Sequence, residues 1–67
     1  MNLKGLRASV NKTQAEVAES IGISRDTYRR IEKGDTDLSL DNGYKLSDLF
    51  DVSIDAIYQA YRATKGI

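Results

Sequence analysis

The chain contains no cysteine, histidine, proline or tryptophan. Without cysteine it has no disulfide framework and no thiolate metal site, which fits a reducing compartment such as the cytoplasm. Histidine and cysteine are the commonest general bases, nucleophiles and soft-metal ligands, so their absence argues against catalysis. We therefore expect a protein that is not an enzyme and that needs neither a metal nor another cofactor.

Long apolar runs are also absent. No segment approaches the roughly 18–20 apolar residues of a membrane helix, and the start of the chain lacks the apolar core of a signal peptide. We expect no membrane partner and a cytoplasmic location. The 67 residues allow one domain, spanning residues 1–67. A core of this size supplies only about 3–5 kcal/mol of net stability, which favours a packed helical bundle or help from oligomerisation.

The ten basic and ten acidic residues cancel in total but are unevenly distributed. Residues 1–34 contain seven basic and four acidic side chains, whereas residues 35–67 contain three basic and six acidic ones. The neutral total therefore hides a dipolar molecule. Its basic half is the part expected to meet nucleic acid.

Apolar residues recur at three- and four-residue spacing, which is the pattern of amphipathic helices. The pattern predicts five helices, over residues 2–10, 14–21, 25–33, 40–50 and 54–62. The last four each follow a hydroxyl residue that serves as N-cap, namely Thr13, Ser24, Ser39 and Ser53. In the fourth helix the expected core anchors are Leu40, Tyr44, Leu46, Leu49 and Phe50. Its interior Gly43 costs about 1 kcal/mol relative to alanine, so we expect another helix to approach closely there.

Residues 14–34 have the layout of a helix-turn-helix. Two short amphipathic segments are separated by Gly22, which accepts the left-handed backbone conformation that ends a helix. Ile23 fills the turn, and Ala18 is small where the two helices would nearly touch. This motif presents its second helix to the major groove of DNA.

Outward-facing positions near the start of the second helix are candidates for base contacts, namely Ser24, Arg25, Asp26, Arg29 and Arg30. Arginine suits this place because its planar fork can donate two hydrogen bonds to guanine. Asp26 is unusual here, since phosphates repel a carboxylate. Three interpretations are open: Asp26 accepts a hydrogen bond from cytosine, its negative charge stabilises the positive N-terminal end of the helix, or it aligns Arg30. We favour the last two together.

Polar residues at the start of the first motif helix (14–21) and along the second motif helix (25–33) are candidates for phosphate contacts. They are Lys12, Thr13, Gln14, Thr27, Tyr28 and Lys33. Ordinary capping is an equally good explanation for Thr13 and Gln14. Lys33 either reaches phosphate or complements the dipole at its helix C-terminus. Tyr28 and Ile31 form the inner face of the second motif helix, and the hydroxyl of Tyr28 is a candidate to reach the DNA backbone from there.

The order of the motifs TQAEVA (13–18), IGISR (21–25), IEKG (31–34), SLD (39–41) and LFDVSID (49–55) resembles the Cro and phage-repressor, or xenobiotic-response-element, helix-turn-helix family. The resemblance implies an all-α, lambda-repressor-like bundle of five helices that dimerises on a roughly palindromic operator. It also implies phosphate binding by Gln14, and base contacts from the positions of Ser24, Arg25, Asp26 and Arg30. A partly buried ion pair between Arg7 and Glu32 is a further implication, which makes Arg7 structural rather than a DNA contact.

Two departures from the family pattern are notable. The loop after the second motif helix, often able to hold phosphate in the family, is the acidic segment Asp35-Thr36-Asp37 here, which argues for modest affinity. Position 12, often apolar in relatives, is Lys12, whose aliphatic stem is expected to cover the core.

Sequence-specific DNA binding by a Cro- or repressor-like transcriptional regulator is the leading hypothesis. The alternatives are a small phage-type modulator or antirepressor, or an antitoxin, that binds a repressor or another protein. The neutral total and the acidic second half favour the modulator or antirepressor, whereas no distinctive motif supports the antitoxin. Candidates for a homodimer or partner surface are Ile57, Tyr58, Tyr61 and Ile67. Helical spacing favours a core role for Ile57 and Tyr58, which leaves Tyr61 and Ile67 as the better candidates.

Overall fold

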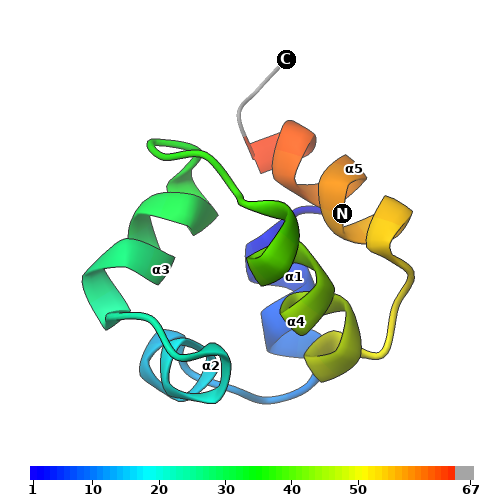
Figure 1. The fold of residues 1–67 in the computed structure, drawn as a ribbon. Helices are drawn as coiled ribbons and strands as arrows, with labels where there is room; N and C mark the ends of the chain where they lie inside the picture. Colours follow the sequence, from blue (N-terminus) through cyan, green and yellow to red (C-terminus); the bar gives the residue numbers. More distant parts are fainter. Residues whose placement is uncertain (65–67) are drawn as a thin grey trace.

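The structure, a computed structural model, describes residues 1–64. In that range the regular structure consists of five helices without a strand: α1 (Leu3–Ser9), α2 (Gln14–Ile21), α3 (Arg25–Lys33), α4 (Leu40–Phe50) and α5 (Ile54–Thr64). The expected all-α, five-helix fold is confirmed. The three middle helices have the predicted bounds; α1 is one residue shorter at each end, and α5 runs on to Thr64. Figure 1 shows α3 on one side of the molecule and α5 on the other, with α1 and α4 between them.

Hydroxyl caps and left-handed glycines set most of the helix ends, as predicted. Thr13 and Glu16 form the reciprocal capping box, with the Glu16 N–H donating to Thr13 Oγ1 at 3.1 Å and the Thr13 N–H donating to Glu16 Oε1 at 2.8 Å. The other three hydroxyl caps likewise accept a hydrogen bond from the N–H three residues on. Gly22 and Gly34 end α2 and α3 with φ values of 78° and 81°. Local chemistry therefore fixes the lengths of the helices that form the motif.

Every helix contributes buried apolar side chains to one core. Its members are Leu3, Leu6, Val17, Ala18, Ile21, Tyr28, Ile31, Leu38, Leu46, Phe50, Ile57, Ala60 and Tyr61. Helix α2 packs on α3, α4 packs on α5, and α5 also contacts α1 and α3. Residues 1–64 contain no helix with both the length and the apolarity that a membrane crossing requires.

Two residues suggested for a partner surface belong to this core. Ile57 is fully buried, and Tyr61 is 7% exposed with its hydroxyl donating to a backbone carbonyl in the α3–α4 loop at 2.6 Å. The suggestion was wrong for both, because α5 turns this side toward α1 and α3. Tyr58 is half-buried, and its hydroxyl donates to the Leu38 carbonyl at 3.0 Å. Ile67 lies outside the described residues.

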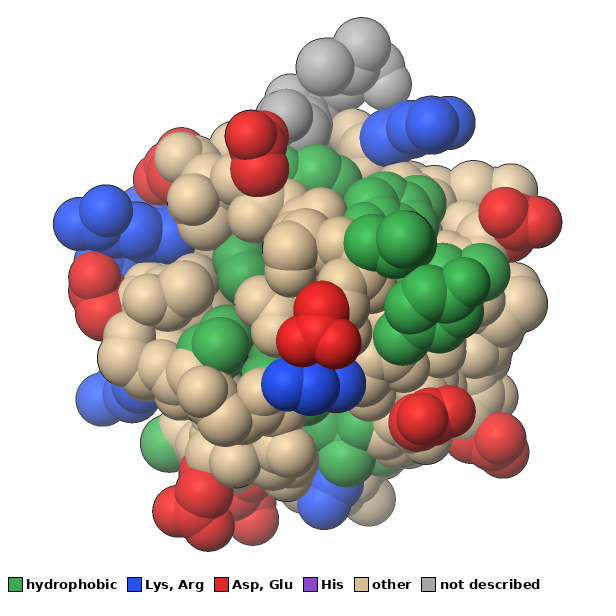
Figure 2. Space-filling model, viewed as in Figure 1, with side chains coloured by type: hydrophobic (Ala, Val, Ile, Leu, Met, Phe, Trp, Pro, Cys, Tyr) green, Lys and Arg blue, Asp and Glu red, His purple; other side chains and the backbone are tan. Residues whose placement is uncertain are grey.

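Helix α4 is rotated differently from the expectation. Leu40 and Tyr44, predicted as core anchors, are 60% and 56% exposed, which corrects that prediction. Gly43, Leu46 and Phe50 face inward instead. Figure 2 shows the resulting group of hydrophobic side chains on the side of the molecule formed by α4 and α5.

The inward rotation explains the glycine in α4. A Cβ atom at Gly43 would lie 3.0 Å from Cε2 of Tyr58 and 3.2 Å from Cδ1 of Ile54. The expected close approach of another helix is therefore confirmed, and that helix is α5.

Candidate nucleic-acid interface

The turn between α2 and α3 is closed by two backbone hydrogen bonds. The Gly22 N–H donates to the Glu19 carbonyl at 3.2 Å, and the Ile23 N–H donates to the Ala18 carbonyl at 3.0 Å. This is a helix C-terminus in which a left-handed residue satisfies the last carbonyls. Ile23 is half-buried against the core and Ala18 is buried at the contact between the helices. Helix α3 is thus held rigidly on α2.

The outer face of α3 is exposed and carries a small charge network. Ser24, Arg25, Asp26, Arg29 and Arg30 are all exposed. Asp26 accepts from Arg29 at 2.8 Å and pairs with Arg30 at 3.2 Å. The hydrogen bond from Arg29 and the charge of Arg30 lower the pKa of the Asp26 carboxyl. This geometry favours the interpretation that Asp26 aligns the arginines, and its place in the first turn of α3 suits the helix dipole.

Ser24 also closes the start of α3 with Thr27. Its hydroxyl accepts from the Thr27 N–H at 3.1 Å and donates to Thr27 Oγ1 at 2.8 Å. Both residues are exposed, and both lie at the start of α3 beside Arg25. Ser24 has its hydroxyl hydrogen engaged and presents an acceptor to the surroundings.

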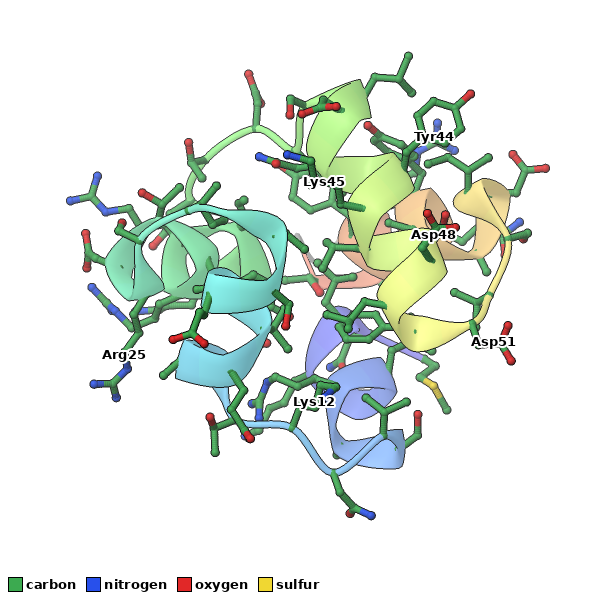
Figure 3. The ribbon with its side chains drawn as sticks, turned by 60° about the horizontal axis from the view of Figure 1, so that its bottom comes forward. Lys12, Arg25, Tyr44, Lys45, Asp48 and Asp51 are labelled. Carbon is green, nitrogen blue, oxygen red and sulfur yellow. The ribbon has the colours of Figure 1, made fainter. Side chains whose placement is uncertain are left out.

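A groove lies where the start of α2 meets the start of α3. Its lining includes Arg7, Asn11, Lys12, Thr13, Gln14 and Arg25. Figure 3 shows Lys12 and Arg25 in the lower half of the view, on the opposite side of the ribbon from Tyr44. The groove therefore joins the positive end of α2 to the basic face of α3. The sequence did not predict that Asn11 lines this groove. The only signal was its residue type, because asparagine tolerates the left-handed backbone conformation that Asn11 adopts, with a φ of 57°.

The ion pair between Arg7 and Glu32 is present, as predicted. Arg7 Nε lies 2.9 Å from Glu32 Oε2, and Arg7 NH2 donates to Oε1 at 3.1 Å. The side chains are 16% and 5% exposed, so the pair is largely withdrawn from water. Burial raises the pKa of the Glu32 carboxyl, but hydrogen bonds from Arg7 and Gln14 outweigh it and hold this pKa below its ordinary value. Arg7 is therefore a structural residue.

Comparison with known proteins identifies the family. A family model described as helix-turn-helix matches residues 3–57. The chain belongs to this helix-turn-helix family. It is 38% identical over 55 residues to the cryptic phage CTXphi transcriptional repressor RstR of Vibrio cholerae, covering 82% of this chain and 49% of the repressor. The chain thus spans about half the length of that relative.

Two archaeal relatives are closer in length. An uncharacterized HTH-type transcriptional regulator of Methanocaldococcus jannaschii is 43% identical over 56 residues, covering 84% of this chain and 85% of the regulator. Another, from Archaeoglobus fulgidus, is 38% identical over 56 residues, covering 84% of this chain and 79% of the regulator. No solved structure matches the chain at a significant level.

Tyr28 does not have the predicted place in this helix-turn-helix. Its side chain is fully buried, and its hydroxyl forms no hydrogen bond with the described residues. Burial and the nearby Glu32 carboxylate raise the pKa of the Tyr28 hydroxyl. The predicted phosphate contact is therefore wrong for this residue, because the core covers it. Its three-residue spacing from Ile31 was the signal for a core position.

The far end of the helix-turn-helix is less basic. Lys33 is exposed in the last turn of α3 and lines a second groove, toward Lys4 and α1. Asp35 and Asp37 are exposed in the loop that follows. The acidic loop therefore separates the basic face of α3 from α4.

Proposed function

We propose that the protein is a sequence-specific DNA-binding transcriptional regulator that reads operator DNA in the major groove with α3. The observation that carries this proposal is the exposed arginine face of α3 beside the groove at the start of α2. The names of the relatives, a phage repressor and HTH-type regulators, support it. Such a role requires no catalysis, and it implies the cytoplasm of a prokaryotic cell or of a phage-infected host.

The two parts of the interface have different tasks in this proposal. Base contacts come from the outer face of α3: Ser24, Arg25, Asp26, Arg29 and Arg30. Phosphate contacts come from residues around it: Lys12, Thr13, Gln14, Thr27 and Lys33. The Asp26–Arg30 pair is exposed on both sides, so it is weak and Arg30 can exchange Asp26 for guanine at little cost.

Selection of bound fragments from random-sequence DNA at two salt concentrations tests the proposal. We expect one enriched motif whose affinity falls steeply with salt. Each neutralised phosphate contributes about −0.9 to the slope of the logarithm of the binding constant against the logarithm of the salt concentration. Arg30→Ala should cost about 1–3 kcal/mol and relax preference at one base pair, whereas Gln14→Ala should weaken all sequences nearly alike. Absence of any enriched motif would refute sequence-specific binding.

We also propose a homodimer, joined through a face on α4 rather than through the buried side of α5. Leu40 and Tyr44 are large exposed hydrophobic residues, and Ile54 and Tyr58 meet the same stretch of α4 at Gly43. Two-fold pairing is the commonest assembly, and helix-turn-helix dimers match palindromic sites. Beside these hydrophobic residues α4 carries one positive and one negative side chain, since Lys45 Nζ lies 3.2 Å from Asp41. In an antiparallel pair of α4 helices, Lys45 of each copy can instead pair with Asp41 of the other copy.

Sedimentation of the protein with and without its selected DNA tests the dimer. Tyr44→Glu should give a monomer with weaker cooperative binding to a palindromic site. Ala8→Glu is the control, because it adds the same charge at an exposed position of α1. A wild-type protein that stays monomeric on DNA would refute the dimer. If Tyr44→Glu then still abolished regulation while Arg30→Ala and Gln14→Ala did not, the face would bind another protein. That result would favour a modulator, antirepressor or antitoxin.

A further inference from the structure

The Arg7–Glu32 ion pair connects four parts of the fold. Glu32 Oε1, near the end of α3, accepts hydrogen bonds from Arg7 NH2 and from Gln14 Nε2, each at 3.1 Å. Arg7 also donates through NH1 to the Lys12 carbonyl at 2.9 Å. Helix α1, the connection before α2, the first residue of α2 and the end of α3 therefore meet at the Arg7–Glu32 pair, whose side chains are 16% and 5% exposed. The bond to Gln14 goes beyond the ion pair itself.

Gln14, the first residue of α2, reaches the proposed DNA-binding side together with Arg7. It is half-buried and lines both grooves, the one shared with Thr13 and Arg25 and the one shared with Lys4 and Lys33. Its amide group has two N–H donors on one nitrogen and an oxygen that only accepts. Glu32 as a carboxylate only accepts as well, so it selects the nitrogen end of the amide. One N–H is thereby occupied, and the second remains for another acceptor.

We propose that Glu32 is a positioning residue for phosphate binding, which acts by holding the Gln14 amide. This inference rests on the proposed DNA-binding function. An unrestrained glutamine presents its oxygen as readily as its nitrogen and must be immobilised when it binds phosphate. The Glu32 bond orders the amide beforehand. Because Arg7 neutralises the carboxylate through two contacts, Glu32 does this without presenting an unpaired negative charge beside DNA.

A double-mutant cycle on DNA affinity tests the proposal. Glu32→Gln should weaken binding to the selected operator and to unrelated DNA about three- to tenfold, the range for immobilising one long side chain, with base preference unchanged. In a Gln14→Ala background the same substitution should have no further effect. Equal losses in both backgrounds, or no loss in the wild type, would overturn the proposal. Affinities are taken for the folded fraction, and Ile57→Val, a change at a buried residue that lines neither groove, controls for lost stability.

The wild-type protein offers a second measurement if Glu32→Gln does not fold. The chain has two glutamines, and Gln59 is exposed on α5, so its side-chain amide is an internal NMR control. The Gln14 amide hydrogens should exchange more slowly than those of Gln59, and added operator DNA should shift the Gln14 signals only. Equal exchange, or no shift of Gln14 by DNA that binds, would overturn the proposal. A wild-type protein that binds no DNA would instead refute the proposed function.

Discussion

Replacing Gly43 with alanine should destabilise the protein although it improves helix propensity. Alanine gains about 1 kcal/mol over glycine inside a helix. The new Cβ, however, would lie 3.0 Å from Cε2 and 3.1 Å from the hydroxyl oxygen of Tyr58, and 3.2 Å from Ile54. The Tyr58 ring cannot retreat freely, because its hydroxyl donates to the Leu38 carbonyl at 3.0 Å. The side chain that must yield is therefore tied to the loop before α4.

The balance of these effects gives the expected magnitude. Overpacking of this kind costs about 1–3 kcal/mol, and loss of the Tyr58 hydrogen bond adds about 1 kcal/mol. The lost hydrogen bond and the gain in propensity roughly cancel, so we expect Gly43→Ala to lower the free energy of unfolding by about 1–3 kcal/mol. In a domain of this size each kcal/mol lowers the melting temperature by about 4–8 °C.

Urea unfolding followed by helical circular dichroism measures the effect, with Gly5→Ala as the matched control. A Cβ at Gly5 would lie 3.0 Å from Cγ of Met1, a residue that is 80% exposed, and 3.3 Å from Oδ1 of Asn2, the N-cap of α1, so its neighbours are exposed side chains rather than another helix. Gly5→Ala should therefore stabilise α1 by up to about 1 kcal/mol. If both alanines stabilised the protein alike, the packing of α5 against Gly43 would not be tight and the reasoning would be refuted.

Three further predictions concern single residues. Asp51 ends α4 with φ 56°, so Asp51→Gly should stabilise the fold by about 0.5–1 kcal/mol in thermal melts, and an unchanged melt would contradict backbone strain there. Tyr28→Phe removes a buried hydroxyl that forms no hydrogen bond among the described residues, so stability should stay equal or rise and DNA affinity should not change. Weaker DNA binding by this variant would indicate that the hydroxyl does contact phosphate. The pKa of Glu32 is lower in the folded than in the unfolded state, so its stabilising contribution is present above about pH 4.5 and is lost as the pH falls below that value. Acid unfolding followed by circular dichroism should therefore be less steep for Glu32→Gln.

Most of the fold could be predicted because its signals are local. A capping box needs only Thr13 and Glu16 three residues apart, and a helix end needs only a glycine in the left-handed region, such as Gly22. These features fix the bounds of α2 and α3 independently of the rest of the chain. The exposed arginines follow from the same argument, since the apolar stripe of α3 leaves one face for solvent.

The rotation of α4 could not be predicted in the same way. Leu40 and Tyr44 have the four-residue spacing of a core stripe, yet Gly43 and Leu46 face inward. Long-range contacts decide between these two stripes, above all the packing of Tyr58 from α5 against the glycine. Both patterns are apolar enough to be buried, so composition alone does not separate them.

The candidate site shows the same division. The ion pair between Arg7 and Glu32 was expected from the family resemblance, whereas the bond from Gln14 to Glu32 joins side chains 18 positions apart and carries no local signal. Tyr28 was predicted on the inner face of α3 with Ile31, and only its hydroxyl was expected to reach phosphate. The burial of the hydroxyl depends on how α3 packs on α2 and α5, which only the assembled fold reveals.

The neutral net charge of the chain is a poor guide to DNA binding. Exposed charges are screened beyond about 8 Å at physiological salt, whereas the molecule measures 27 × 23 × 21 Å. Arg25 lies on one side and Asp51 on another, well apart in Figure 3. In the proposed function, acidic residues of α4 and α5 therefore add little repulsion at phosphates near α3. The salt dependence of binding should thus report the basic residues beside the groove rather than the balance of the whole chain.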